Sequence, residues 1–174
     1  VNGETAYVMY QQGYRIRPEN GAVCFALEQD PYFNRTPEHF SSHQHTPNNP
    51  DSSAPGAVLT QNTAYLGWKL FSEYAEMGSF HVKELLCHAI DALLGDEKIL
   101  TTDLPDRGVT TLMEQETENR LVHHLLFAYT TNRGKKTEVI QDIIPLYNIH
   151  ASIQSAKATK EEYMAHSKEP LPYT

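Results

Sequence analysis

The stretch of residues 109–129 constrains the fold more than any other part of the chain. It holds two runs rich in β-branched and apolar residues, separated by the polar tetrad Glu116-Thr117-Glu118-Asn119. Two such runs around a polar turn predict a β-hairpin. Alternate residues of the second run are mostly apolar on both faces, a pattern typical of a central strand covered on both sides.

Two helices are predicted before this hairpin. Trp68, Phe71 and Tyr74 share one face of the first, which Gly78 should end. The second should run from a cap at Ser79 to Gly95. Its predicted apolar face consists of Val82, Leu85, Leu86, Ala89 and Leu93. A central strand with a helix before it predicts a layered α/β domain over residues 1–144. Apolar runs on either side of Pro145 predict that residues 145–174 begin a β-domain.

Charge and composition exclude some classes of function. The formal net charge of the 174 residues is -8, and no basic cluster of the kind that binds nucleic acid is present. No apolar stretch reaches the ~20 residues of a membrane span, and no signal peptide is visible, so we expect a cytoplasmic protein. Cys24 and Cys87 lie in apolar surroundings and are predicted to be buried free thiols. The first residue is Val1, close to an apolar run, which indicates a piece of a longer protein.

A proline-rich segment, residues 30–56, is predicted to be a loop. It is longer than the ~12–15 residues usual for a structureless connection, so we expect a functional, interfacial or mobile loop. Aromatic rings stack on sugars, and histidines supply hydrogen bonds. Tyr32, Phe33, His43 and His45 are therefore the predicted contacts with a sugar or a partner.

The histidines leave an alternative open. His39, His43 and His45 could hold a metal ion as part of a small metal-dependent hydrolase, or could form hydrogen bonds within the loop. His123 and His124 are consecutive in the second strand of the hairpin, so they should point to opposite faces. One of them is predicted to be a core histidine with hydrogen-bond partners.

No complete active site is predicted. Glu114, Glu116 and Glu118 alternate along the chain as paired carboxylates would, but they flank a turn and are expected to be solvated. There is no nucleophile elbow and no glycine-rich phosphate loop. We therefore assign no catalytic, cofactor-binding or metal-binding residue.

Several segments together resemble a known family. They are Pro31-Tyr32-Phe33-Asn34-Arg35, Phe40-Ser41-Ser42-His43-Gln44-His45-Thr46-Pro47, Leu104-Pro105 with Gln115, Asn119-Arg120-Leu121-Val122-His123-His124-Leu125-Leu126, and Glu138-Val139-Ile140-Gln141-Asp142-Ile143-Ile144-Pro145-Leu146. In this combination the chain resembles the C-terminal portion of beta-galactosidase-like glycoside hydrolases. In that family a catalytic TIM barrel precedes a trimerisation domain and a small β-sandwich. The resemblance implies a partial flavodoxin-like sheet, similar to class I glutamine amidotransferases.

The resemblance also implies a function. The family's catalytic glutamates lie on the barrel, so none is carried over to this chain. We expect a non-catalytic assembly domain that supports oligomerisation and shapes a neighbouring active site. Its expected partners are further copies of itself, the catalytic barrel of the parent chain and possible carbohydrate, without nucleic acid or membrane. The alternatives are the histidine-based metal hydrolase and a ligand-binding regulatory module of amidotransferase-like fold.

Overall fold

The chain forms two compact units, Val1–Asp96 and Glu97–Thr174, in a computed structural model. The structure describes residues 6–19, 21–42, 46–155 and 158–173. Each unit is described by itself below. The predicted domain boundary at residues 144 and 145 stays a prediction.

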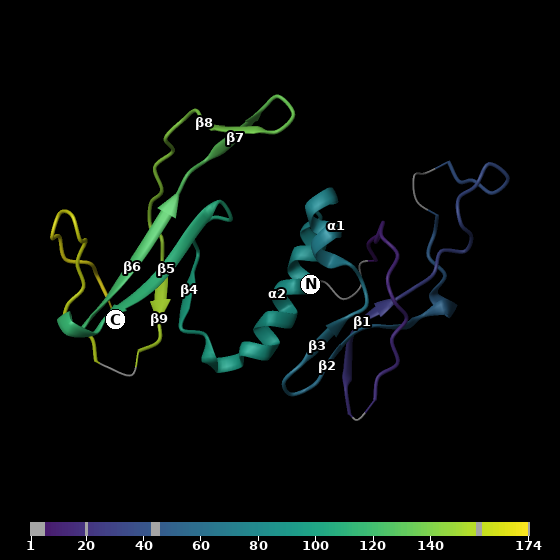
Figure 1. Cartoon of the computed structure of the whole chain (residues 1–174), viewed down its shortest axis with the longest axis horizontal. Coiled ribbons are helices and arrows are strands. Elements are labelled where there is room, and N and C mark those ends of the chain that lie inside the picture. The colour runs from purple at the N-terminus through teal and green to yellow at the C-terminus, as the bar shows by residue number, and fades with distance from the viewer. Residues whose placement is uncertain (1–5, 20, 43–45, 156–157, 174) are drawn as a thin grey trace. The chain divides into compact units, whose positions relative to one another are not determined.

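The first unit combines a small antiparallel sheet with two helices (Figure 1). The sheet has the order β1-β2-β3, with β1 at Val23–Glu28, β2 at Ala54–Leu59 and β3 at Ala64–Leu66. Helix α1 covers Leu70–Met77 and ends at Gly78, whose left-handed backbone suits a residue without a Cβ. Helix α2 covers Phe80–Leu94 and ends at Gly95, as predicted. Short 3₁₀ turns occupy Pro50–Ser52 and Gly95–Glu97.

The core of this unit is small. Leu70, Val82 and Leu85 form its buried centre. Partly buried apolar side chains pack around them: Met9, Phe25, Ala26, Leu66, Trp68 and Leu86. The predicted face of α2 is confirmed at Val82, Leu85 and Ala89, which are buried, and at Leu86, which is partly buried. It is wrong at Leu93, which is 40% exposed near the end of the helix.

The predicted face of α1 is wrong. Phe71 is 78% exposed, whereas Leu70 and Glu73 are buried. Glu73 is only 1% exposed, and its carboxylate accepts hydrogen bonds from two backbone N–H groups. Tyr10 N–H donates to Oε1 and Gln11 N–H donates to Oε2, each over 2.9 Å. Glu73 therefore fastens the N-terminal segment to α1, because a buried carboxylate requires such partners.

The described residues of the second unit form three separate two-stranded antiparallel sheets. Strand β5, Gly108–Gln115, pairs with β6, Arg120–Phe127, through a 3₁₀ turn at Glu116–Glu118. The predicted hairpin and its turn are thereby confirmed. The other pairs are β4 (Leu100–Thr102) with β9 (Ala151–Ile153), and β7 (Thr130–Arg133) with β8 (Thr137–Ile140).

The predicted fold class is wrong. A flavodoxin-like fold requires a parallel sheet with helices on both faces, whereas every strand pair in the described residues is antiparallel and the sheets have two or three strands. The prediction that β6 is a covered central strand also fails. Within the described residues β6 pairs with β5 alone, and Leu126 is 66% exposed. Apolar residues on both faces therefore do not mark burial within this chain.

Candidate functional site

Hydrogen bonds tie together the two ends of the predicted contact loop, residues 28–32 and 47–53. This closed base of the loop is called the neck. Backbone bonds close it where Asn49 N–H donates to the Asp30 carbonyl over 2.8 Å, and Tyr32 N–H donates to the Pro47 carbonyl over 3.1 Å. The Asp30 N–H also donates to Ser52 Oγ over 2.7 Å. Arg15 forms ion pairs with Glu28, over 3.1 Å, and with Asp30. The neck is an extension of the β1–β2 pair, so the sheet holds both ends of the loop.

Aromatic side chains lie just beyond this neck. Tyr32 is 62% exposed and follows Pro31, which forms a bridge with Asn48. Phe33 is half-buried, and its ring centroid lies 6.3 Å from that of His39. Of the two predicted aromatic contacts, Tyr32 has an open ring and Phe33 a partly covered one, and Phe40, further along the loop, is 72% exposed. An open ring next to a rigid neck can stack on a flat apolar surface at small entropic cost.

The two predicted histidine contacts, His43 and His45, lie outside the described residues. His39 is described and exposed, in a turn where its backbone N–H and carbonyl both bond to Thr36. In the part of the chain that is described, no group of three or more His, Cys, Asp or Glu side chains could hold a metal ion. The metal-site hypothesis therefore stays a prediction.

The hairpin histidines differ in their surroundings. His123 Nε2 lies 2.7 Å from Thr110 Oγ1 and is half-buried, while His124 is exposed, 3.4 Å from Thr111 Oγ1. Burial, and secondarily the neighbouring His124, lower the pKa of the His123 imidazole. His123 is therefore a partnered histidine, as predicted for one of the two, although its strand is less buried than expected. Glu114, Glu116 and Glu118 are all exposed, in line with the prediction that they are solvated.

The sequence did not predict a second histidine arrangement, at the end of β4. Asp103 Oδ1 accepts the His150 backbone N–H over 2.7 Å, and Oδ2 lies 2.8 Å from His150 Nδ1. The hydrogen bonds from His150 lower the pKa of the Asp103 carboxyl. This pair joins the end of β4 to the residue before β9, and the long separation in sequence gives no local pattern to detect it.

Two further expectations concern thiols and membranes. Cys24 and Cys87 are free, as predicted, but both are exposed, so the prediction of buried thiols is wrong. In the described residues no helix combines the length and apolar composition that crossing a membrane requires.

Comparison with known proteins points to a glycoside hydrolase. No protein-family model and no curated protein sequence matches the chain. Among solved structures, the chain is similar to alpha-L-fucosidase isoenzyme 2 from Paenibacillus thiaminolyticus. The TM-score is 0.91 and the sequence identity is 37%, over 98% of this chain and 26% of that chain. The chain therefore spans about a quarter of the length of the fucosidase. The predicted resemblance holds at the level of glycoside hydrolases, and nothing in the comparison is specific to beta-galactosidases.

Proposed function

We propose that this chain is a non-catalytic part of a carbohydrate-active glycoside hydrolase, which supports assembly and shapes an active site that other parts of the protein supply. The observation that carries the proposal is the similarity to a quarter-length portion of an alpha-L-fucosidase. A segment that follows another protein over 98% of its own length, at 37% identity, is a strong candidate for the same position in a related protein.

The surface of the chain supports an assembly role. Its accessible surface is 14216 Å². A compact folded protein of 19.7 kDa exposes about 8,600 Å², and two separately folded domains of the sizes of its two units expose about 10,400 Å² together. The difference from the two-domain value, about 3,800 Å², is several times the ~800 Å² that one partner loses in a standard interface. Surface of this extent fits a segment that is covered by other parts of a larger protein.

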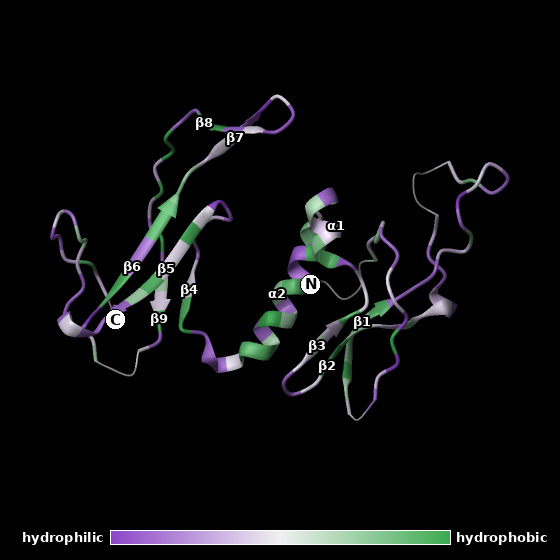
Figure 2. Ribbon diagram, in the orientation of Figure 1, coloured by the Kyte–Doolittle hydropathy of each residue, from purple (hydrophilic) through white to green (hydrophobic). Residues whose placement is uncertain are grey.

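The uncovered surface is rich in apolar side chains. Figure 2 shows hydrophobic residues along β6 and along α2, which belong to different units. Exposed members in the second unit include Val109, Met113, Leu121, Leu125 and Leu126. Val109, Met113 and Leu126 lie on one face of the β5–β6 hairpin, and Leu121 and Leu125 lie on the other. Exposed apolar side chains gathered on an element in this way mark an interaction site in a native protein. Both units therefore contribute to the proposed assembly.

The loop contact is part of the same proposal. Tyr32 and Phe33, with His43 and His45, would contact a sugar or a partner at the edge of the neighbouring active site. Tyr32 is the most informative of these positions because its ring is open and its backbone N–H is held by Pro47. A Tyr32→Ala variant should lose the contact without unfolding, and Tyr65→Ala, an exposed tyrosine on β3, is the matched control.

The name of the structurally similar enzyme suggests a substrate for the glycoside hydrolase to which we assign this chain. The alpha-L-fucosidase similarity favours an α-L-fucoside, and the beta-galactosidase resemblance of the motifs makes a β-galactoside the second candidate. Addition of L-fucose and of D-galactose, followed by amide shifts in an NMR spectrum, tests the loop. A sugar contact predicts shifts at Tyr32 and Phe33 for the matching sugar, which disappear in Tyr32→Ala. A cytoplasmic location stays a prediction.

Sedimentation velocity and a glycosidase assay on the 174-residue chain test the function. We expect concentration-dependent self-association and no turnover of nitrophenyl α-L-fucoside or β-D-galactoside. Turnover by the chain alone would contradict a non-catalytic role. A monomer that holds one equivalent of zinc, lost in a His43→Ala His45→Ala variant, would instead support the alternative, a small metal-dependent hydrolase.

A further inference from the structure

Helix α2 carries a second side-chain stripe directly opposite its buried face. The buried face contains Val82, Leu85 and Ala89. At 3.6 residues per turn, the opposite side is centred on Cys87. The residues of this stripe are Phe80, Lys83, Glu84, Cys87, Ile90, Asp91 and Leu94. Its apolar members Phe80, Ile90 and Leu94 are exposed, and so is the Cys87 thiol.

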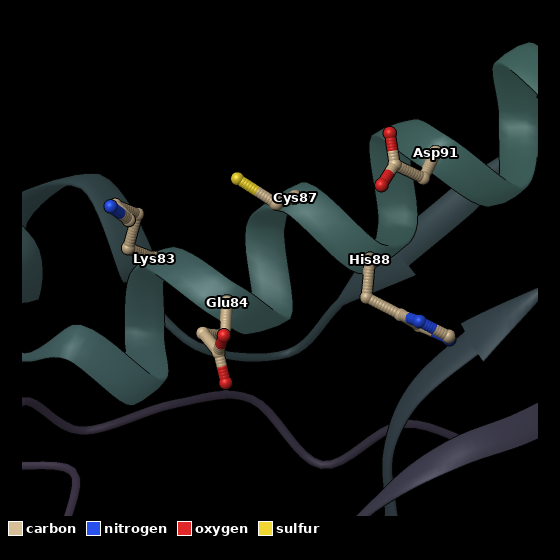
Figure 3. A pocket seen from close by; sticks show the side chains of 5 residues that line it. All are labelled: Lys83, Glu84, Cys87, His88 and Asp91. Carbon is tan, nitrogen blue, oxygen red and sulfur yellow. The ribbon is translucent and has the colours of Figure 1, made fainter. Parts of the chain in front are cut away.

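The stripe has the spacing of a helix-pairing seam. Phe80, Cys87 and Leu94 are seven residues apart, and Ile90 lies three residues after Cys87. Side chains at these intervals form the contact line between two packed helices. A shallow groove of about 240 Å³ runs along this side of α2, lined by Lys83, Glu84, Cys87, His88 and Asp91. Figure 3 shows Lys83, Cys87 and Asp91 on the same side of the helix, with Glu84 and His88 on the adjoining side.

The chemistry of the stripe is complementary to its own reverse. Lys83 and Asp91 each lie four residues from Cys87, on opposite sides, and Phe80 and Leu94 each lie seven residues from it. Reversal of the helix about Cys87 therefore exchanges the cation Lys83 with the anion Asp91 and the aromatic Phe80 with the aliphatic Leu94. It also exchanges Glu84 with Ile90, so the complementarity is carried by the first two pairs. A two-fold axis requires this self-complementarity, because the same patch must fit itself.

We propose that α2 pairs with α2 of a second copy of this chain, antiparallel, with a two-fold axis at Cys87. Lys83 then faces Asp91 of the partner subunit, and Phe80 packs on the partner's Leu94. In the single chain the Lys83 ammonium lies 5.5 Å from the centroid of the Phe80 ring, so two members of the stripe already contact each other. The inference rests on the self-association in the proposed function and names the surface responsible for it.

Helix-packing distances allow the central contact. Packed helices have axes about 8–10 Å apart, and each Cα lies about 2.3 Å from its own axis. Facing Cα atoms on the seam are therefore about 3.4–5.4 Å apart, a range that overlaps the ~4.4–6.8 Å that a disulfide spans. The fifteen residues of α2 form a helix about 22 Å long. A seam of that length buries less than a standard interface, so weak association is expected and a covalent trap is the suitable assay.

A thiol crosslink on the 174-residue chain tests the axis. Diamide accepts two electrons and two protons when two thiols form a disulfide, and both cysteines of this chain are exposed. We expect Cys24→Ser to give a covalent dimer as fast as the unchanged chain, whereas Cys87→Ser should reduce its formation at least tenfold. A dimer that forms through Cys24 instead, or equally through both thiols, overturns the proposed axis.

Charge reversal tests the pairing independently of the thiol. Lys83→Asp places two like charges at each end of the seam, and Asp91→Lys does the same with the opposite sign. Each single variant should weaken self-association roughly tenfold, because the contact occurs twice about the axis. The double variant restores opposite charges and should recover most of the loss in sedimentation experiments.

The outcomes separate this inference from the proposed function. A chain that self-associates, but forms no Cys87 crosslink and shows no charge rescue, refutes the α2 seam while self-association stands. A chain that stays monomeric at all concentrations refutes both. Circular dichroism of each variant confirms that α2 is folded, so a lost dimer reports on the surface and not on the helix.

Discussion

The buried carboxylate of Glu73 provides the sharpest test of the first unit. Each hydrogen bond to a charged group contributes roughly 1.5–3 kcal/mol, and Glu73 accepts two of them, from Tyr10 and Gln11. Glu73→Ala removes both acceptors and opens a cavity beside Leu70, so the free energy of unfolding should fall by roughly 3–5 kcal/mol. Glu73→Gln keeps one acceptor oxygen and turns an NH₂ group toward the other donor, so it should cost roughly 2–3 kcal/mol.

Urea unfolding followed by Trp68 fluorescence measures these costs, because Trp68 packs against the core and is the one tryptophan of the chain. Losses of this size are a large fraction of the ~5–15 kcal/mol that stabilises a domain. Amide hydrogen exchange at Tyr10 and Gln11 gives a second measurement, which should accelerate in both variants. Glu76→Gln, an exposed glutamate on the same helix, is the control and should change stability by less than about 0.5 kcal/mol.

The relative stability costs of Glu73→Gln and Glu73→Ala show whether the Glu73 carboxylate acts as a hydrogen-bond acceptor. If Gln and Ala are equally costly, the carboxylate does not act through its two oxygen acceptors and only its volume matters. If neither variant changes the exchange of the Tyr10 and Gln11 amides, the N-terminal segment is held by other contacts. Either result refutes the account of Glu73 as a fastening between this segment and α1.

Two further predictions concern packing and pH. A Cβ at Gly56 would overlap the Trp68 ring, so Gly56→Ala should lower the free energy of unfolding by roughly 2–3 kcal/mol in a urea titration. Gly134 has open space and a φ of +66°, so its Ala variant should lose only about 1 kcal/mol from backbone strain. The pKa of His123 is lowered by burial first and by His124 second, so its contribution to stability is complete above the unfolded pKa of about 6.5 and is lost as pH falls through the folded value. His123→Gln should therefore make the melting temperature less sensitive to mild acid, and an unchanged pH profile would contradict this.

Local signals in the sequence predicted the local structure. The polar tetrad 116–119 forms the turn of the β5–β6 hairpin, where Asn119 adopts a left-handed conformation with φ of 48°. Gly78 and Gly95 end the two helices as expected. These predictions succeed because a turn or a helix end depends on the conformational preferences of a few consecutive residues.

Long-range pairing left no comparable signal. Strand β9 pairs with β4 and is reinforced by His150 and Asp103, which are 47 residues apart. Periodicity shows that a short apolar run can be a strand, but it does not show which strand it joins. The closed base of the predicted contact loop could not be predicted for the same reason. It depends on hydrogen bonds from Gln29 to Ser53 and from Asp30 to Ser52, which are more than twenty residues apart in the sequence.

Besides the fold class, the sequence wrongly predicted which side chains are buried, and the cause of that error is physical. An apolar pattern records which side chains must leave water, but it does not record what covers them. On α1 a charged residue, Glu73, occupies the buried face, because backbone donors from another segment satisfy it. On β6 apolar side chains occupy both faces, yet Leu121, Leu125 and Leu126 are exposed in the folded chain.

This error and the excess surface have one explanation under the proposed function. If β6 and the outer side of α2 are covered by other parts of a larger glycoside hydrolase or by a second copy, their apolar patterns describe burial in that assembly. The pattern on α2 then differs from that on β6 in a testable way. Lys83 and Asp91 make the α2 stripe complementary to itself, whereas the exposed β6 side chains Leu121, Leu125 and Leu126 carry no charge to select a copy of the same strand. Charge reversal on α2 should therefore change the number of subunits in the assembly, whereas polar substitutions on β6 should lower the stability of every species equally.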